Sequence, residues 1–130
     1  MLAVAGCLTA AVIAGCGPSE RAPDAASVAE RFYTALEERD GGAACSELKE
    51  ETSDKLEQEE ERPCEEAVVS LELPRGGSAA GTNVYLTTAS VDLAEGGTTF
   101  LDEGPDGWKV SAAGCRPTAA DLPYDCELED

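Results

Sequence analysis

Residues 82–112, TNVYLTTASVDLAEGGTTFLDEGPDGWKVSA, decide the fold class of this chain. Apolar and polar side chains alternate with a period of two in four short runs, which predicts β-strands at residues 82–86, 89–94, 98–103 and 107–112. The connections between these runs, residues 87–88, 95–97 and 104–106, are short enough for hairpins, so we expect an antiparallel meander. The expected inward positions of that sheet are Val84, Leu86, Val91, Leu93, Phe100, Trp108 and Val110.

The part of the chain before these strands has a helical period. Residues 27–30, SVAE, form a capping box that predicts the start of a helix, and residues 40–42, DGG, predict its end. We expect shorter helices at residues 43–50, after Thr52 or Ser53, and at residues 63–71. Residues 75–81, RGGSAAG, indicate a flexible joint between the helices and the strands.

These patterns predict one α+β domain over residues 27–130. Its N-terminal helices, within residues 27–73, would pack on an antiparallel four-stranded meander within residues 82–113. Only 5% of the residues are aromatic, so the apolar core is expected to be modest and to need covalent support. The last segment, 115–126, is expected to be irregular and closed by a disulfide.

The charge of the chain limits its partners. Asp and Glu number 27 against nine Lys and Arg, which gives a formal net charge of −18. A field of this sign repels nucleic-acid phosphates and anionic lipid headgroups, so we expect no nucleic-acid partner, whereas a cationic partner is allowed. The chain contains no His, which excludes catalysis by an imidazole base and metal sites that need imidazole.

The first 26 residues indicate an export signal and a tether. Residues 1–15 are apolar apart from one Thr, which suits a signal-peptide core and is too short for a comfortable membrane span of about 20 residues. Residues 13–16, IAGC, resemble a bacterial lipobox, in which the Cys16 thiol receives diacylglycerol and becomes the new N-terminus. The Pro-rich polar residues that follow predict a flexible tether over residues 16–26.

An ordinary signal peptide and a core helix remain alternatives to this interpretation of residues 1–16. No Lys or Arg precedes the apolar run, so we expect the basic part of the signal to lie upstream of Met1. If Cys16 is lipidated, the acyl chains make attachment essentially permanent. The expected location is then the extracytoplasmic face of the plasma membrane, with the lipid on Cys16 as the contact with the membrane.

The remaining cysteines predict two disulfides. With Cys7 removed in the leader and Cys16 lipidated, four cysteines remain in an oxidising compartment, and four allow three pairings. We expect the pairs that are local in sequence, Cys45–Cys64 and Cys115–Cys126. A zinc site of four thiolates is the competing interpretation, but no Cys-x-x-Cys spacing supports it.

Three short stretches, in this order, resemble a known family. They are residues 29–36, AERFYTAL, residues 106–110, DGWKV, and residues 123–126, PYDC. The chain between about residues 27 and 126 resembles small actinobacterial lipoproteins of the nuclear transport factor 2-like, ketosteroid isomerase-like type. This resemblance implies a cone of helices against a curved sheet, in most such lipoproteins without an assigned activity.

No group of residues fixes a chemical reaction. Ten acids within residues 47–66 suggest a solvated face, although a calcium or cationic-partner surface is conceivable. Residues 102–107, DEGPDG, indicate a hairpin turn, because a calcium loop would need an acid where Ala113 stands. Asp92 with Tyr33 or Tyr85 could serve acid–base chemistry in a cone, but Asp92 alternates outward and the tyrosines are better explained as half-buried packing groups.

We therefore expect no catalytic residue, cofactor or metal. The function that the sequence favours is a tethered, non-catalytic domain that binds a protein or a small apolar ligand. The alternatives are an acid–base enzyme of the ketosteroid isomerase-like fold and a structural component of the cell envelope. An open cone with an aspartate and a hydroxyl would favour the enzyme, an open apolar cone would favour ligand binding, and a filled cone would favour an interaction surface.

Overall fold

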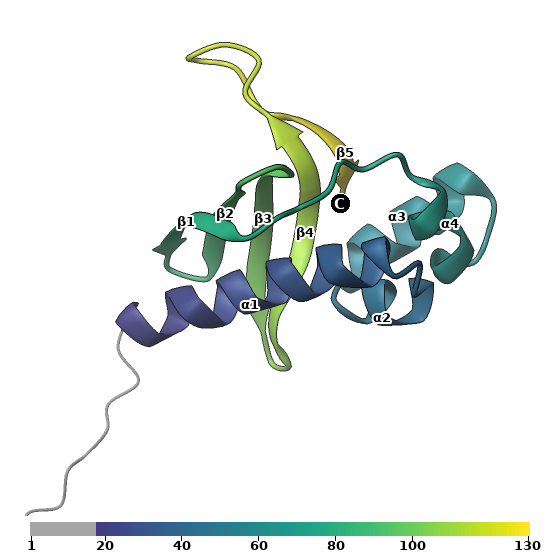
Figure 1. Ribbon diagram of the computed structural model, residues 1–130, viewed down its shortest axis with the longest axis horizontal. Helices are drawn as coiled ribbons and strands as arrows, with labels where there is room; N and C mark the ends of the chain where they lie inside the picture. The colour runs from purple at the N-terminus through teal and green to yellow at the C-terminus, as the bar shows by residue number, and fades with distance from the viewer. Residues whose placement is uncertain (1–17) are drawn as a thin grey trace, which may run out of the picture.

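All the helices precede all the strands in this computed structural model, which describes residues 18–130 (Figure 1). The helices are α1 (Pro18–Glu37), α2 (Gly41–Ser46), α3 (Glu50–Glu60) and α4 (Cys64–Ser70). The strands are β1 (Ala79–Tyr85), β2 (Thr88–Leu93), β3 (Gly97–Gly104), β4 (Gly107–Arg116) and β5 (Asp125–Glu129). They form one antiparallel sheet in sequence order, so the predicted α+β meander is confirmed.

The sheet has one strand more than the four predicted. Segment 115–126 was expected to be irregular, but β4 continues to Arg116 and β5 pairs with it, bringing Cys115 opposite Cys126. The sequence of β5, DCELE, is rich in acids, which are uncommon in strands, so its local signal is weak. Pairing with β4 and the disulfide therefore create this strand.

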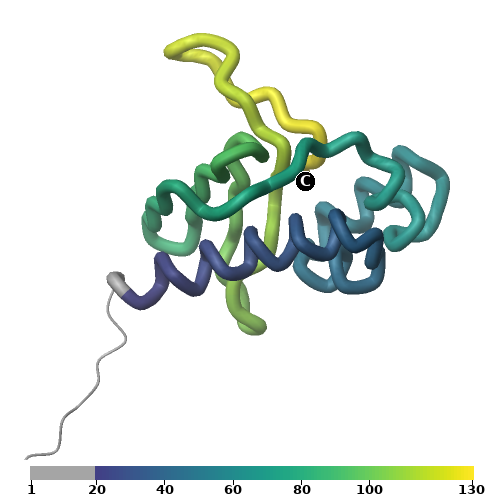
Figure 2. Tube along the Cα trace, in the orientation of Figure 1, coloured from purple at the N-terminus to yellow at the C-terminus, as the bar shows by residue number. Residues whose placement is uncertain are grey.

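The sheet is bent along β3 and β4. Their pairing shifts register on both sides of Phe100, so that β4 has extra residues at each point. Such bulges increase the twist and bend of a strand. In Figure 1, α1 lies across one face of the sheet, and in Figure 2 the segment after α4 crosses back over the molecule to begin β1.

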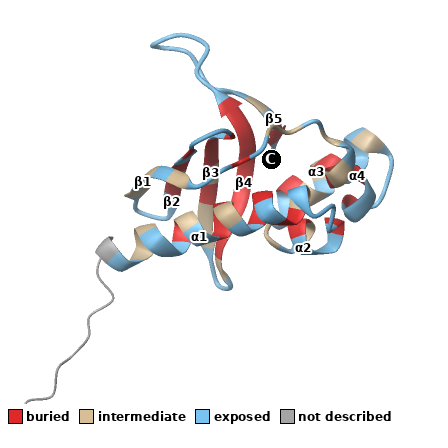
Figure 3. Ribbon diagram, in the orientation of Figure 1, coloured by how far each residue is buried: buried red, intermediate tan, exposed pale blue. Residues whose placement is uncertain are grey.

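The main core lies between α1 and the face of the sheet that α1 covers (Figure 3). Phe32 from α1 and Val91, Leu101 and Val110 from the sheet are fully buried there. The sheet positions predicted to face inward are mostly confirmed. Confirmed as buried or half-buried against the core are Val84, Val91, Leu93, Trp108 and Val110.

The predicted inward positions of Leu86 and Phe100 are wrong. Tyr85 pairs with Thr88, so Leu86 lies in a two-residue hairpin loop beyond the end of β1, where its side chain is 72% exposed. Phe100 lies opposite Ser90 on the other face of the sheet, where its ring packs edge-on against Tyr124. The neighbouring Leu101, which was not predicted, points to the core and is fully buried.

The first helix begins much earlier than predicted. Helix α1 starts at Pro18, so from residue 18 onward the tether expected at residues 16–26 is helical. Tertiary contacts outweigh the cost of Pro23 inside the helix, since Ala25 is fully buried and Arg21 contacts the sheet. The capping box is not formed either, because the Glu30 carboxylate accepts a hydrogen bond from the Ala79 N–H at 3.0 Å.

The other helices are close to their predicted positions but differ at their ends. Helix α2 is capped by Asp40, whose carboxylate accepts from the Ala43 N–H at 3.0 Å, and it ends at Ser46 instead of residue 50. Helix α3 begins at Glu50, so Thr52 lies inside it and is not its cap. The buried Thr52 hydroxyl donates to the Ser111 carbonyl at 3.0 Å, which attaches α3 to β4.

Candidate functional site

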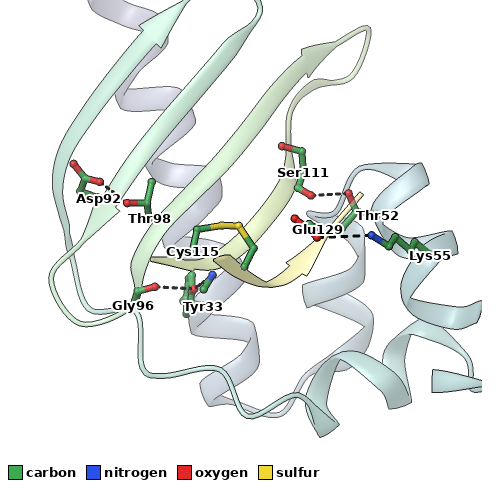
Figure 4. The surroundings of a disulfide bond; sticks show 11 residues. Tyr33, Thr52, Lys55, Asp92, Gly96, Thr98, Ser111, Cys115 and Glu129 are labelled. Carbon is green, nitrogen blue, oxygen red and sulfur yellow. Dashed lines mark hydrogen bonds and ion pairs between the residues drawn. A yellow bond between two sulfur atoms is a disulfide. The ribbon is translucent and has the colours of Figure 1, made fainter. Parts of the chain in front are cut away.

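The centre of the molecule is built around Tyr33 of α1 (Figure 4). Its hydroxyl donates to the Gly96 carbonyl at 3.2 Å and accepts from the Gly114 N–H at 3.1 Å. The side chain is 2% exposed, and its burial raises the pKa of the phenol. The expectation of a half-buried Tyr33 with a solvated hydroxyl is therefore wrong, because this hydroxyl is used to join the β2–β3 turn to β4.

The predicted joint at residues 75–81 is packed against this same tyrosine. A Cβ atom added to Gly76 would lie 2.5 Å from Cγ of Tyr33, so only glycine fits there. The Gly76 carbonyl accepts from the N–H groups of Glu95 and Gly96 at 3.0 and 3.1 Å. The segment is thus held between α1 and the β2–β3 turn, which differs from the flexible connection that its Gly-rich sequence indicated.

The residues considered for acid–base chemistry do not come together. Asp92 is exposed between the buried Val91 and Leu93, and its carboxylate accepts from the Thr98 hydroxyl at 2.8 Å (Figure 4). Tyr85 is 76% exposed at the end of β1. Since Tyr33 is enclosed in the core, the described residues offer no pocket in which this carboxylate and these hydroxyls meet.

Both predicted disulfides are present. Cys45–Cys64 links α2 to α4, and Cys115–Cys126 links β4 to β5 (Figure 4). The four-thiolate zinc site is excluded, because all four thiols are used in disulfides. The predicted lipidation site Cys16 and the leader, residues 1–15, lie outside the described residues.

Two surface hollows flank the β3–β4 hairpin. One, of about 480 Å³, lies between the hairpin and the start of α3, and the other, of about 580 Å³, lies between the hairpin and α1. Both are lined in part by Glu103, Asp106 and Lys109. The hairpin itself closes with Gly104 opposite Gly107, which confirms the predicted turn.

Two of the cations beside these hollows, Lys49 and Arg31, are held in ion pairs. The Lys49 ammonium lies 2.8 Å from the Asp130 carboxylate and 3.0 Å from that of Asp102, and these contacts raise the pKa of Lys49 well above its usual range. Arg31 pairs with Glu47 at 2.8 Å. Because the acids here outnumber the cations, the surface around the hairpin is negative and suits a cationic partner. Within residues 18–130, the carboxylates and cysteines do not gather into a metal-binding group.

Arg21 is a contact residue that sequence reasoning missed, because it lies in the expected tether. Its guanidinium stacks 5.3 Å from the centre of the Trp108 ring and forms an ion pair with Glu103. The same side chain donates to the Leu86 carbonyl at 2.6 Å. The helical spacing of Ala22, Ala25 and Ala29 was the available signal that a helix begins before residue 27.

Comparison with known proteins gives no relative: no family model, curated protein or solved structure matches this chain. In the described part of the chain, no helix has the length and apolar character needed to cross a membrane.

Proposed function

We propose that this protein is a lipoprotein tethered through Cys16 to the extracytoplasmic face of the plasma membrane, and that its domain is a non-catalytic interaction module. The tether is supported by residues 13–16, IAGC, and by the position of every charged side chain after Cys16, from Glu20 onward. An oxidising compartment is supported by the two disulfides, because disulfides persist in exported proteins and are rare in reducing compartments.

The observation that carries the interaction module is the filled interior. Phe32, Leu101 and Val110 are fully buried between α1 and the sheet, where a ligand-binding cone would be open. The buried Tyr33 hydroxyl is already bonded to two backbone groups. A partner would therefore bind to the outer surface, and the negative charge of that surface favours a cationic protein.

The nuclear transport factor 2-like type belongs to the same proposal. Its support is the order of elements, with helices first and then an antiparallel meander bent by bulges. Membership of this type carries no catalytic role for the chain, since Asp92 and Tyr85 are exposed and separate from Tyr33.

Metabolic labelling tests the tether. Cells expressing the full chain or its Cys16→Ser variant are grown with radiolabelled palmitate, and the purified proteins are compared by autoradiography and intact mass. We expect label and the mass of the acyl groups on the wild type only. Equal labelling of the two proteins would refute lipidation at Cys16.

Capture from membranes tests the interaction module. The tethered protein is crosslinked in intact cells, purified, and analysed by mass spectrometry for proteins and for small molecules, with the Cys16→Ser variant as the unanchored control. We expect a cationic protein that is enriched with the anchored chain and whose yield falls when salt is added before the crosslinker, because exposed charge pairs are screened by ions. A stoichiometric small molecule instead would overturn the interaction module in favour of a ligand-binding domain.

A further inference from the structure

The turn between β1 and β2 presents two large apolar side chains to solvent. Tyr85 is 76% exposed and Leu86 72%, the highest values among the large hydrophobic residues that the structure describes. The two are adjacent and lie at the tip of a hairpin, so nothing from the sheet covers them. Adjacent exposed apolar side chains of this size are typical of a surface that meets a partner or a membrane.

The backbone of Leu86 strengthens this interpretation. Its φ is +52°, in the left-handed region that Gly or Asn adopts at lower cost. A hairpin loop with positive φ at its first residue normally has Gly there. The fold therefore gains nothing from a leucine at this position, and strain of this kind is concentrated at functional sites.

The position of this turn relative to Cys16 can be derived from chain geometry. Cys16 precedes the first residue of α1, Pro18, by two residues, which span at most about 7 Å. Arg21 lies three residues further along the helix, about 5 Å. Its side chain donates to the Leu86 carbonyl at 2.6 Å, so Leu86 lies within about 20–25 Å of Cys16 whatever the conformation of residue 17.

The tip of the turn and the start of α1 lie on the same side of the molecule (Figure 1). We propose that the β1–β2 turn inserts Tyr85 and Leu86 into the lipid–water interface beside the lipid on Cys16. This inference rests on the proposed lipidation. A tyrosine at the interface keeps its hydroxyl in water while its ring meets the lipid, and the leucine side chain enters the acyl region.

Charge explains why the contact is confined to this turn. The domain is strongly acidic, so anionic headgroups repel most of its surface. Asn83 and residues 86–88 of the turn carry no charge. The nearest charges are Arg21, which is paired with Glu103, and Asp102 opposite Thr88, so the uncharged part is the tip of the turn itself. The second exposed apolar group, Leu122 and Tyr124, lies in the loop between β4 and β5, which projects away from the start of α1 (Figure 1).

Depth-dependent fluorescence quenching tests the proposal. The full lipidated chain is reconstituted into vesicles of phosphatidylcholine and phosphatidylglycerol, with or without bromine on the acyl chains. A Leu86→Trp variant places a reporter in the turn, and a Leu122→Trp variant is the matched control in the other exposed loop. The single native tryptophan, Trp108, is 6% exposed and supplies a constant background.

We expect the Leu86→Trp emission to shift to the blue and to be lost in brominated vesicles, while Leu122→Trp is unaffected. Intact-mass measurement on the same samples reports lipidation separately. Lipidated protein whose residue-86 reporter is not quenched would overturn the turn's insertion and leave the proposed function standing. A blue shift without quenching would mean that protein covers the turn and would also overturn it. Protein without lipid would overturn the proposed function and this inference together.

Discussion

Replacing Tyr33 with Phe tests whether its hydroxyl holds the helices and the sheet together. The substitution keeps the ring against Gly76 but removes the hydroxyl that bonds Gly96 and Gly114. The Gly114 N–H and the Gly96 carbonyl would then lose this partner inside the core. A buried polar group left without a partner costs about 1–3 kcal/mol, so we expect a loss of about 2–4 kcal/mol in the free energy of unfolding.

Thermal and urea unfolding followed by circular dichroism measure this loss. For a domain of this size, about 2–4 kcal/mol corresponds to a fall of roughly 10–20 °C in Tm. Tyr85→Phe is the matched control, because the same atom is removed from a side chain that is 76% exposed. Its stability should change by less than about 0.5 kcal/mol. Equal Tm values for the two variants would refute the bridging role of the Tyr33 hydroxyl.

The same variant has a signature in alkaline solution. Burial raises the pKa of the Tyr33 phenol above its ordinary value of 10.0, so the unfolded chain releases this proton at lower pH than the folded chain does. The contribution to stability is present below the unfolded pKa and is lost as pH rises through the folded pKa. Wild-type stability should therefore fall more steeply than that of Tyr33→Phe above about pH 10.

Three further substitutions test other parts of the structure. Replacing Cys115 and Cys126 together by Ala opens a loop of 11 residues and should lower the free energy of unfolding, measured by chemical denaturation, by about 3 kcal/mol. An unchanged denaturation midpoint would show that the pairing of β4 and β5 holds this loop without the disulfide. Leu86→Asn removes a leucine from a left-handed backbone conformation, so it should raise the free energy of unfolding by up to about 1 kcal/mol and Tm slightly. A clear fall in Tm would instead place Leu86 in the core. Lys49→Met breaks ion pairs at 2.8 and 3.0 Å and should lower the free energy of unfolding by about 1 kcal/mol. Lys55→Met, which breaks ion pairs only at 4.0 Å, should lower it less. The reverse order of the two variants would contradict the ion-pair assignment.

Features set by neighbouring residues were predictable from the sequence. The hairpins from β1 to β4 follow from a period of two and from short connections, and the disulfide pairs follow from cysteines that are close along the chain. Each of these signals lies within about 20 residues, so no knowledge of the remaining fold was needed.

Features set by distant contacts were not predictable. The start of α1 depends on Arg21 meeting Trp108 and Glu103, more than 80 residues away, while two prolines suggested a tether. Strand β5 forms because β4 offers it a partner, despite the acidic residues in its own sequence. Tyr33 could be recognised as a packing residue, but its hydrogen bonds depend on the β2–β3 turn and on β4, whose places in space only the folded sheet defines.

The bonds of Tyr33 also set the order in which the chain can fold. They span 63 and 81 residues, so the first helix has no completed binding site until β4 exists. Contacts at such separation slow folding, because a long loop must close before they stabilise anything. A chain that is made from its N-terminus must therefore keep the apolar face of α1 exposed until nearly all of it has been synthesised. The Cys45–Cys64 disulfide, by contrast, can form before the strands have been synthesised, because both of its cysteines precede β1 in the chain.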